Sequence, residues 1–159
     1  MWLLLSNPTS GGGKGAKYLK VIVNYFDDKK IEYIDISASS YSEALQNLKR
    51  SLNANGKDIS GLLVIGGDGM VHLAVQELVN TEIPLALIPA GTGNDFARSL
   101  ELPLDSPLLL LERYLKQAPT KVDLGRVNGE IFADILSTDF DSVVNERANR
   151  MKMVKGRLK

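Results

Sequence analysis

Four short apolar segments alternate with stretches of helical spacing through the first two thirds of this chain of 159 residues. They read WLLLS, IEYIDIS, GLLVIGG and PLALIPAG. Such alternation is typical of βα units, in which parallel strands form a sheet that helices cover on both faces. We therefore predict an α/β fold, a three-layer sandwich around a mostly parallel sheet.

The stretches between these segments carry the marks of amphipathic helices. Ser40 and Glu43 have the spacing of a capping box, and Pro107 suits the first turn of a later helix. Two helices should pack their apolar faces on the sheet. Those faces comprise Tyr41, Ala44, Leu45, Leu48 and Leu52 in one helix and Val71, Ala74, Val75, Leu78 and Val79 in the next.

The pattern changes near residue 122, where helices give way to adjacent strands. TKVDLGRV and EIFADILS flank Asn128 and Gly129, a pair typical of a tight hairpin turn. We expect one domain over residues 1–122 and the incomplete start of a second, β-rich domain over residues 123–159. A basic helix should follow the hairpin. Because it is incomplete, this part should be either disordered or paired with another chain, which would make a homo-oligomer.

Composition excludes several classes of function. The formal net charge is zero, so no overall field favours nucleic acid. The chain has no cysteine and one histidine, which excludes disulfides, thiolate chemistry and metal sites built from these residues. The apolar start MWLLLSNP is too short for a signal peptide. We expect a cytoplasmic protein.

Three glycine-rich segments follow predicted strands: NPTSGGGKG at residues 7–15, GGDG at residues 66–69 and PAGTGNDFAR at residues 89–98. The carboxyl ends of parallel strands meet at one edge of a sheet, where ligands bind. Glycines let backbone N–H groups approach an anion, and Lys14 adds a positive charge. The first segment is neither a P-loop nor a GxGxxG motif, so alone it indicates either phosphate binding or a tight turn.

Asp68 stands among three glycines in the second segment. It either caps the helix that begins near Met70, or it organises a Mg²⁺ ion or accepts a proton from an attacking hydroxyl. In the third segment, Thr92 and Asp95 have the spacing of a capping box, which leaves Gly91, Gly93 and Asn94 unexplained. Taken together, the three segments favour phosphate chemistry.

These segments resemble the diacylglycerol kinase catalytic family, which includes bacterial lipid kinases and the sphingosine and ceramide kinases. VDLGRVNGEIF and STDFDSVVNERA extend the similarity over nearly the whole chain. The resemblance implies an NAD kinase-like or phosphofructokinase-like α/β domain and a following β-sandwich domain. It also implies transfer of phosphate from ATP, with Mg²⁺, to a lipid hydroxyl, diacylglycerol-like by default, by an enzyme peripheral to the membrane.

Carried over by position, the resemblance places the nucleotide between three loops. It implies binding by Asn7, Ser10, Gly11, Gly66, Gly67, Gly69, Thr92, Gly93 and Asn94. Asp68 would be the metal-organising carboxylate or the catalytic base. Asp95 and Arg98 would shape their loop rather than touch substrate.

The chain departs from the family's pattern at three positions and in length. Met70 stands where most members have threonine, Leu73 where glutamate is usual, and Asp139 where glycine is usual. Members continue well beyond residue 159. We therefore expect a fragment with reduced or no activity. The alternatives are a soluble NAD kinase-like enzyme, which the GTGNDFAR segment disfavours, and a catalytically silent nucleotide-binding module.

Overall fold

A parallel sheet forms the centre of the protein in the computed structural model, which describes residues 1–133. The strands lie in the order β2-β1-β3-β4, and every pair is parallel. Their bounds are Trp2–Ser6 for β1, Tyr33–Asp35 for β2, Gly61–Gly66 for β3 and Leu85–Pro89 for β4.

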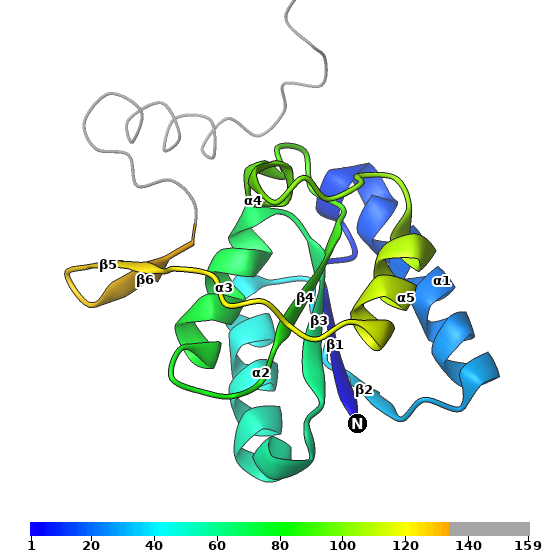
Figure 1. Cartoon of the computed structure of the whole chain (residues 1–159), viewed down its shortest axis with the longest axis horizontal. Helices are drawn as coiled ribbons and strands as arrows, with labels where there is room; N and C mark the ends of the chain where they lie inside the picture. Colours follow the sequence, from blue (N-terminus) through cyan, green and yellow to red (C-terminus); the bar gives the residue numbers. More distant parts are fainter. Residues whose placement is uncertain (134–159) are drawn as a thin grey trace, which may run out of the picture.

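Helices cover both faces of this sheet, as Figure 1 shows. The helices α1 and α5 lie on one face, α2 and α3 lie on the other, and the short α4 lies over the carboxyl edge. Their bounds are Lys14–Lys29 for α1, Tyr41–Asn55 for α2, Asp68–Leu78 for α3, Asp95–Ser99 for α4 and Pro107–Lys116 for α5. Two 3₁₀ turns complete the set: η1 (Ser10–Gly13) precedes α1, and η2 (Gly56–Asp58) follows α2. The predicted three-layer α/β sandwich is confirmed.

The alternation of side chains along the strands builds two cores. In β1, Leu3 and Leu5 pack with α2 and α3, whereas Leu4 packs with α1 and α5. In β3, all six residues are buried, because this strand has a neighbour on each side and helices on both faces. Strand β3 therefore lies at the centre of the domain.

The helix patterns are confirmed with two corrections. Ser40 caps α2, and its Oγ accepts a hydrogen bond from the Glu43 amide at 3.3 Å. Tyr41 was expected on the buried face of α2 but is 53% exposed, whereas Ala44 and Leu48 of the same face are buried. In α3, Leu73 is fully buried in addition to the expected Val71, Ala74, Val75 and Leu78, whereas Val79 follows the helix end and is half-buried.

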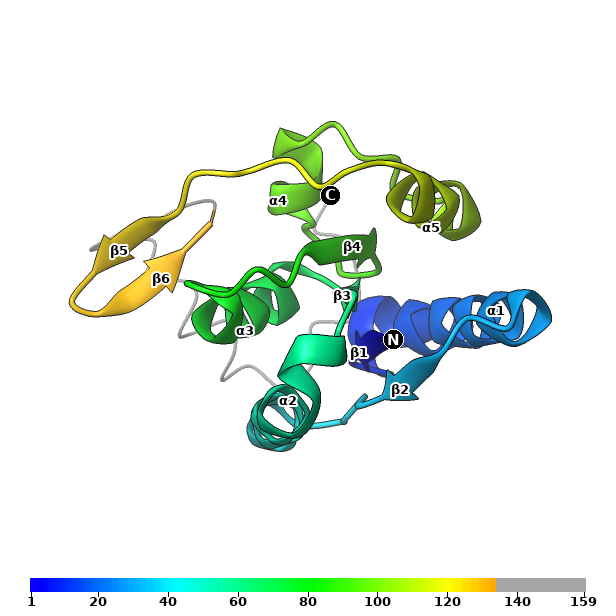
Figure 2. The ribbon, with the colours of Figure 1, turned by 60° about the horizontal axis from the view of Figure 1, so that its bottom comes forward.

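The predicted hairpin is present, with β5 at Gly125–Val127 antiparallel to β6 at Glu130–Phe132. Asn128 and Gly129 have the positive φ values, 49° and 88°, that its two-residue turn requires. Figure 2 shows this hairpin beside α3.

The side-chain amide of Gln76 in α3 holds β6. It donates to the Ile131 carbonyl at 2.6 Å and accepts from the Ile131 amide at 3.0 Å. His72 Nε2 lies 3.0 Å from Glu130 Oε1 alongside. The Gln76 side chain thus pairs with both backbone groups of Ile131, which a neighbouring strand could otherwise bind.

The expected domain boundary at residue 122 stays a prediction. The basic run, the expected helix that contains it and Asp139 lie outside the described residues. Among residues 1–133, no helix is long and apolar enough to cross a membrane.

We predict that Tyr114→Phe lowers the free energy of unfolding by about 1 kcal/mol. Tyr114 Oη donates to the Leu87 carbonyl at 2.9 Å on the edge strand β4, and the variant leaves that carbonyl without its partner. Burial raises the pKa of Tyr114 above its usual value. The neutral hydroxyl therefore stabilises the wild type up to the unfolded-state pKa of about 10, and the difference between the two proteins shrinks as pH rises further.

Urea denaturation at pH 8 and at a pH above about 10 measures this difference. The exposed Tyr41→Phe is the matched control and should change stability by less than about 0.5 kcal/mol. Equal losses in the two variants would contradict the assigned role of the Tyr114 hydroxyl.

Candidate functional site

The three glycine-rich loops lie together at the carboxyl edge of the sheet, following β1, β3 and β4. Strands β1 and β3 are neighbours, yet α1 and α3, which follow them, cover opposite faces. The chain therefore diverges between these two strand ends. Such a switch point is where open parallel sheets bind ligands.

The first loop is folded by its own side chains. Asn7 Oδ1 accepts hydrogen bonds from the Thr9 amide at 3.0 Å and the Thr9 hydroxyl at 2.8 Å. Gly11, Gly12 and Gly13 then have φ values of 55°, 69° and 98°. Side-chain residues rarely adopt such values, so this backbone path depends on glycine.

Backbone contacts between glycines bring the three loops together. A Cβ added at Gly11 would collide with the Ala90 carbonyl oxygen, so the first loop touches the end of β4. A Cβ at Gly91 would lie 2.5 Å from the Gly67 Cα, so the third loop touches the second. These approaches are closer than any side chain allows, and they give the glycines a function that a simple turn does not need.

Asp68 is the first residue of α3, and Gly67 is the N-cap. The Asp68 carboxylate does not cap α3. Its Oδ1 instead accepts a hydrogen bond, at 3.1 Å, from the amide of Phe96 in the first turn of α4. The capping alternative for α3 is therefore wrong. Asp68 instead joins the second loop to the third.

The other oxygen of this carboxylate points to Gly93. A Cβ at Gly93 would lie 3.2 Å from Asp68 Oδ2 and 3.5 Å from Asp95 Oδ2. Two carboxylate oxygens thus lie close to the position that a Cβ of residue 93 would occupy. Lack of a side chain at Gly93 keeps the space beside Asp68 Oδ2 open.

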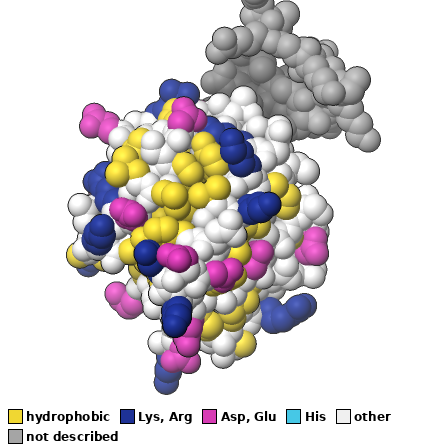
Figure 3. All heavy atoms as spheres, turned by 90° about the vertical axis from the view of Figure 1, so that its right-hand side faces the viewer, with side chains coloured by type: hydrophobic (Ala, Val, Ile, Leu, Met, Phe, Trp, Pro, Cys, Tyr) yellow, Lys and Arg dark blue, Asp and Glu magenta, His cyan; other side chains and the backbone are white. Residues whose placement is uncertain are grey.

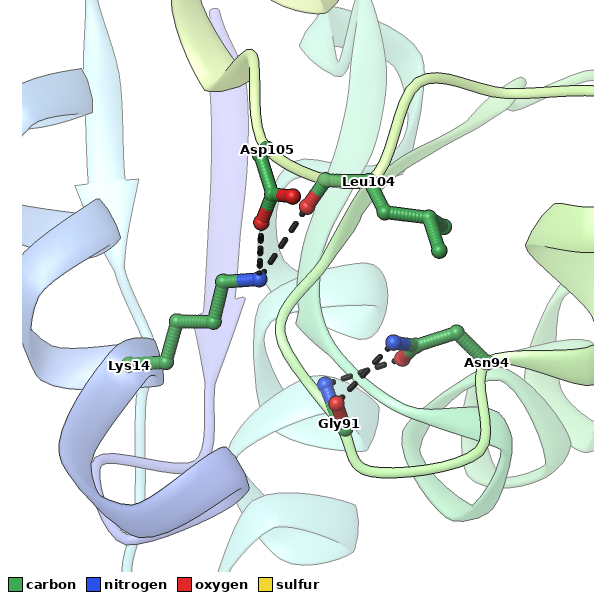
Figure 4. Close-up of polar contacts among 5 residues, drawn as sticks. All are labelled: Lys14, Gly91, Asn94, Leu104 and Asp105. Atoms are coloured by element: carbon green, nitrogen blue, oxygen red, sulfur yellow. Dashed lines mark hydrogen bonds and ion pairs between the residues drawn. The ribbon is translucent and has the colours of Figure 1, made fainter.

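The expected capping box of Thr92 and Asp95 is wrong. The N-cap of α4 is Asn94, which has a left-handed φ of 57° and forms no side-chain capping bond. Its amide instead accepts from the Gly91 N–H and donates to the Gly91 carbonyl, both at 2.9 Å, as Figure 4 shows. Arg98 Nε donates to the Gly93 carbonyl at 3.0 Å. These two side chains shape the loop from within.

Lys14 ties the first loop to the segment before α5 (Figure 4). Its Nζ donates to Asp105 Oδ1 at 2.7 Å and to the Leu104 carbonyl at 3.2 Å. The hydrogen bond to Asp105 raises the pKa of Lys14. The ammonium therefore stays charged at neutral pH, close to the glycine loop.

All the predicted binding residues lie on these three loops, but their side chains are used differently. The amide oxygens of Asn7 and Asn94 hold their own loops. Gly11, Gly69, Thr92 and Gly93 are exposed, Ser10 and Gly67 are half-buried, and Gly66 is buried. A Cβ at Gly69 would meet no atom of the described chain within 4 Å, so packing does not explain glycine there.

Several contacts at the site were missed by sequence reasoning. The Ala90 carbonyl and the Phe96 amide are backbone groups, and no side-chain pattern marks them. The partnership of Lys14 with Asp105 joins residues 91 positions apart. The sequence did point to Gly91, because the predicted capping box of Thr92 and Asp95 left this glycine unexplained.

The departures from the family pattern in α3 have structural explanations. Met70 Cγ would lie 2.7 Å from a Cβ at Gly66, so Met70 packs directly over that glycine. Leu73 is fully buried in the core between the sheet and α2 and α3. His72 is partly exposed.

The carboxylates of this site suit Mg²⁺, but they cannot supply all of its ligands. Residues 1–133 contain no group of three potential ligands among histidine, aspartate and glutamate side chains. Mg²⁺ usually takes one or two carboxylates, and waters and substrate phosphates complete its shell. Asp68, with Asp95 nearby, fits that requirement.

We predict that Gly11→Ala destabilises the protein by about 1–3 kcal/mol more than Gly12→Ala. Both glycines have left-handed φ values, so both variants pay the same backbone strain. Only Gly11 faces the Ala90 carbonyl, whereas a Cβ at Gly12 meets no atom within 4 Å. Urea unfolding of the two variants measures the difference, and equal losses would show that the two loops do not touch.

We also predict that Leu73→Glu, which restores the usual family residue, destabilises the protein by about 3 kcal/mol or more, because it buries a carboxylate in an apolar core. Leu73→Met is the control and should cost less than about 1.5 kcal/mol. Thermal and urea unfolding report both. A Glu variant as stable as the Met variant would contradict the buried position of Leu73.

Similar proteins include curated diacylglycerol kinases. That of Mycobacterium tuberculosis is 37% identical over 160 residues, covering 98% of this chain and 51% of the relative. That of Bacillus subtilis is 28% identical over 134 residues, covering 83% of this chain and 43% of the relative. The chain thus spans about half the length of these relatives.

A crystal structure of a diacylglycerol kinase from Bacillus anthracis has the same fold, with a TM-score of 0.63 and 30% identity. The match covers 82% of this chain and 45% of that one. The sequence-family model of the diacylglycerol kinase catalytic domain matches residues 1–127 of this chain. This chain belongs to the diacylglycerol kinase catalytic domain family.

Proposed function

We propose that this chain is the nucleotide-binding part of a lipid kinase, which transfers the γ-phosphate of ATP to a lipid hydroxyl, diacylglycerol-like by default. The observation that carries the proposal is the convergence of three glycine loops around Asp68 at the switch point of the sheet. Membership of the family and the names of the relatives support the same reaction.

The loops suit a triphosphate because they offer bare backbone and a cation. Gly12, Gly13 and Gly69 leave open space around their Cα atoms. The N-terminus of α3 adds a positive dipole end beside that space. Lys14 adds its charge from the first loop.

Asp68 is placed to act on the reacting groups. Its Oδ1 is held by the Phe96 amide, which orients the carboxylate and leaves Oδ2 toward the open side at Gly93. In the proposed reaction the lipid hydroxyl oxygen attacks the γ-phosphorus, the bond to the β-phosphate oxygen breaks, and ADP leaves. Asp68 Oδ2 either accepts the hydroxyl proton or holds a water of the metal.

Mg²⁺, when bound with ATP, would neutralise charge on the triphosphate. Asp68 is the residue proposed to hold it, with Asp95 beside it. The chain's own contribution is to fix the carboxylate: the glycine contacts position the loops, and the Phe96 amide fixes the rotamer. The lipid substrate places the enzyme at a membrane surface, as a peripheral protein of the cytoplasm.

We expect Asp68→Asn to lower phosphate transfer about 100-fold or more while the fold is retained, because its amide oxygen can still accept from Phe96 N–H. Asp68→Ala should lose both transfer and some stability, since that amide then lacks its partner. Transfer from radiolabelled Mg-ATP to diacylglycerol and other lipids in detergent micelles, and to NAD and fructose 6-phosphate, provides the measurement. Asp58→Asn, at the opposite edge of the sheet, is the control.

The pattern of labelling decides between functions. Label in a lipid that is lost in Asp68→Asn supports the proposal. Label in NAD or the sugar phosphate alone would replace it with a soluble kinase, and bound ATP without any label would replace it with a silent binding module. A metal role for Asp68 predicts residual activity that rises with Mg²⁺ concentration, whereas a base role predicts none.

A further inference from the structure

The face formed by α1 and α5 carries exposed leucines near the carboxyl edge of the sheet. Leu108 and Leu109 lie in the first turn of α5 and are 40% and 62% exposed. Figure 3 looks onto this face and shows apolar side chains gathered in its upper half, the end at which α4 lies in Figure 1. Adjacent exposed leucines at a helix start are not needed for the core, which uses Leu110 and Leu111.

The packing of α5 requires this exposure. Leu110, Leu111 and Tyr114 face the sheet, so the preceding pair projects away from it. Within residues 1–133, no other residue covers the exposed part of these two side chains. Apolar side chains grouped in this way mark an interaction site more often than chance exposure does.

Basic side chains lie on the neighbouring helix α1 and on α5 itself. The first half of α1, which packs beside α5, carries Lys14, Lys17 and Lys20 at three-residue intervals and no acidic residue before Asp27. Arg113 lies one helical turn after Leu109. Figure 3 shows Lys and Arg side chains near the apolar group, with Asp and Glu side chains among them.

The acidic residues near these leucines are largely neutralised. Asp105 pairs with Lys14 at 2.7 Å, and Glu112 with Lys116 at 3.6 Å. Glu101 is exposed on the connection between α4 and α5. Within residues 1–133, Lys17 and Lys20 form no ion pair. Positive charge therefore predominates at the upper end of α1.

We propose that Leu108 and Leu109, with Lys17 and Lys20, form the surface by which the protein docks on an anionic lipid bilayer. Leucines that enter the interface and lysines that attract anionic headgroups are the two elements of peripheral membrane binding. Lys14 joins this face to the first glycine loop, so docking here brings the bilayer close to the candidate site. The inference rests on the proposed lipid kinase function and identifies the face that meets the lipid.

The test uses the full chain and vesicles of phosphatidylcholine with and without phosphatidylglycerol, in a sedimentation assay. We expect binding to the anionic vesicles, weakened by salt. Leu108→Gln with Leu109→Gln should lower partitioning about tenfold, since both apolar contacts are lost without adding charge. Lys17→Gln with Lys20→Gln should lower binding to anionic vesicles by about tenfold and hardly affect neutral ones.

Tyr41→Gln is the matched control, because Tyr41 is an equally exposed apolar residue in the first turn of α2 on the opposite face. It should leave vesicle binding unchanged. Thermal unfolding checks that each variant folds. Wild-type protein that does not bind the vesicles, or binding that the leucine pair does not change, overturns the proposal.

Two further outcomes separate this proposal from others. If the leucine pair instead dissociates a dimer in light scattering, the face is a contact between copies and the membrane proposal is wrong. Leucine-dependent vesicle binding without phosphate transfer to any lipid supports the docking surface and rejects the kinase function. Transfer to micellar lipid without vesicle binding supports the function and rejects the surface.

Discussion

The pairing of β3 with β1 on one side and β4 on the other holds the rest of the described structure together. All six residues of β3 are buried, and its neighbours end at the same edge of the sheet. The three loops can therefore touch, although they are far apart in sequence. Without this register, Gly11 would not reach Ala90 and Gly67 would not reach Gly91.

The order of these strands also decides where the helices go. From the central pair, the chain leaves β1 on one face of the sheet and β3 on the other. Loop backbone and the start of α3 lie beyond these two strand ends. Few charged side chains lie there, chiefly the Asp68 carboxylate and the Lys14 ammonium, whose positions are set by partners on other loops.

Local patterns predicted what local forces determine. Ser40 caps its helix by accepting a hydrogen bond from the Glu43 amide, because both groups belong to one turn of helix. Thr92 and Asp95 have the same spacing, but the prediction failed there because Asn94 binds both polar groups of Gly91 and begins the helix two residues later. The glycines of the site were recognised in the sequence, whereas their contacts required the strand register to be known.

Helix α3 links two parts of the molecule that are usually considered separately. Its first residue is Asp68, and Gln76, two turns further on, grips both backbone groups of Ile131 in the hairpin. A helix of eleven residues behaves as a stiff rod over that length. The hairpin and the Asp68 carboxylate are therefore positioned by one helix, the hairpin through Gln76 in its last turns and the carboxylate at its first residue.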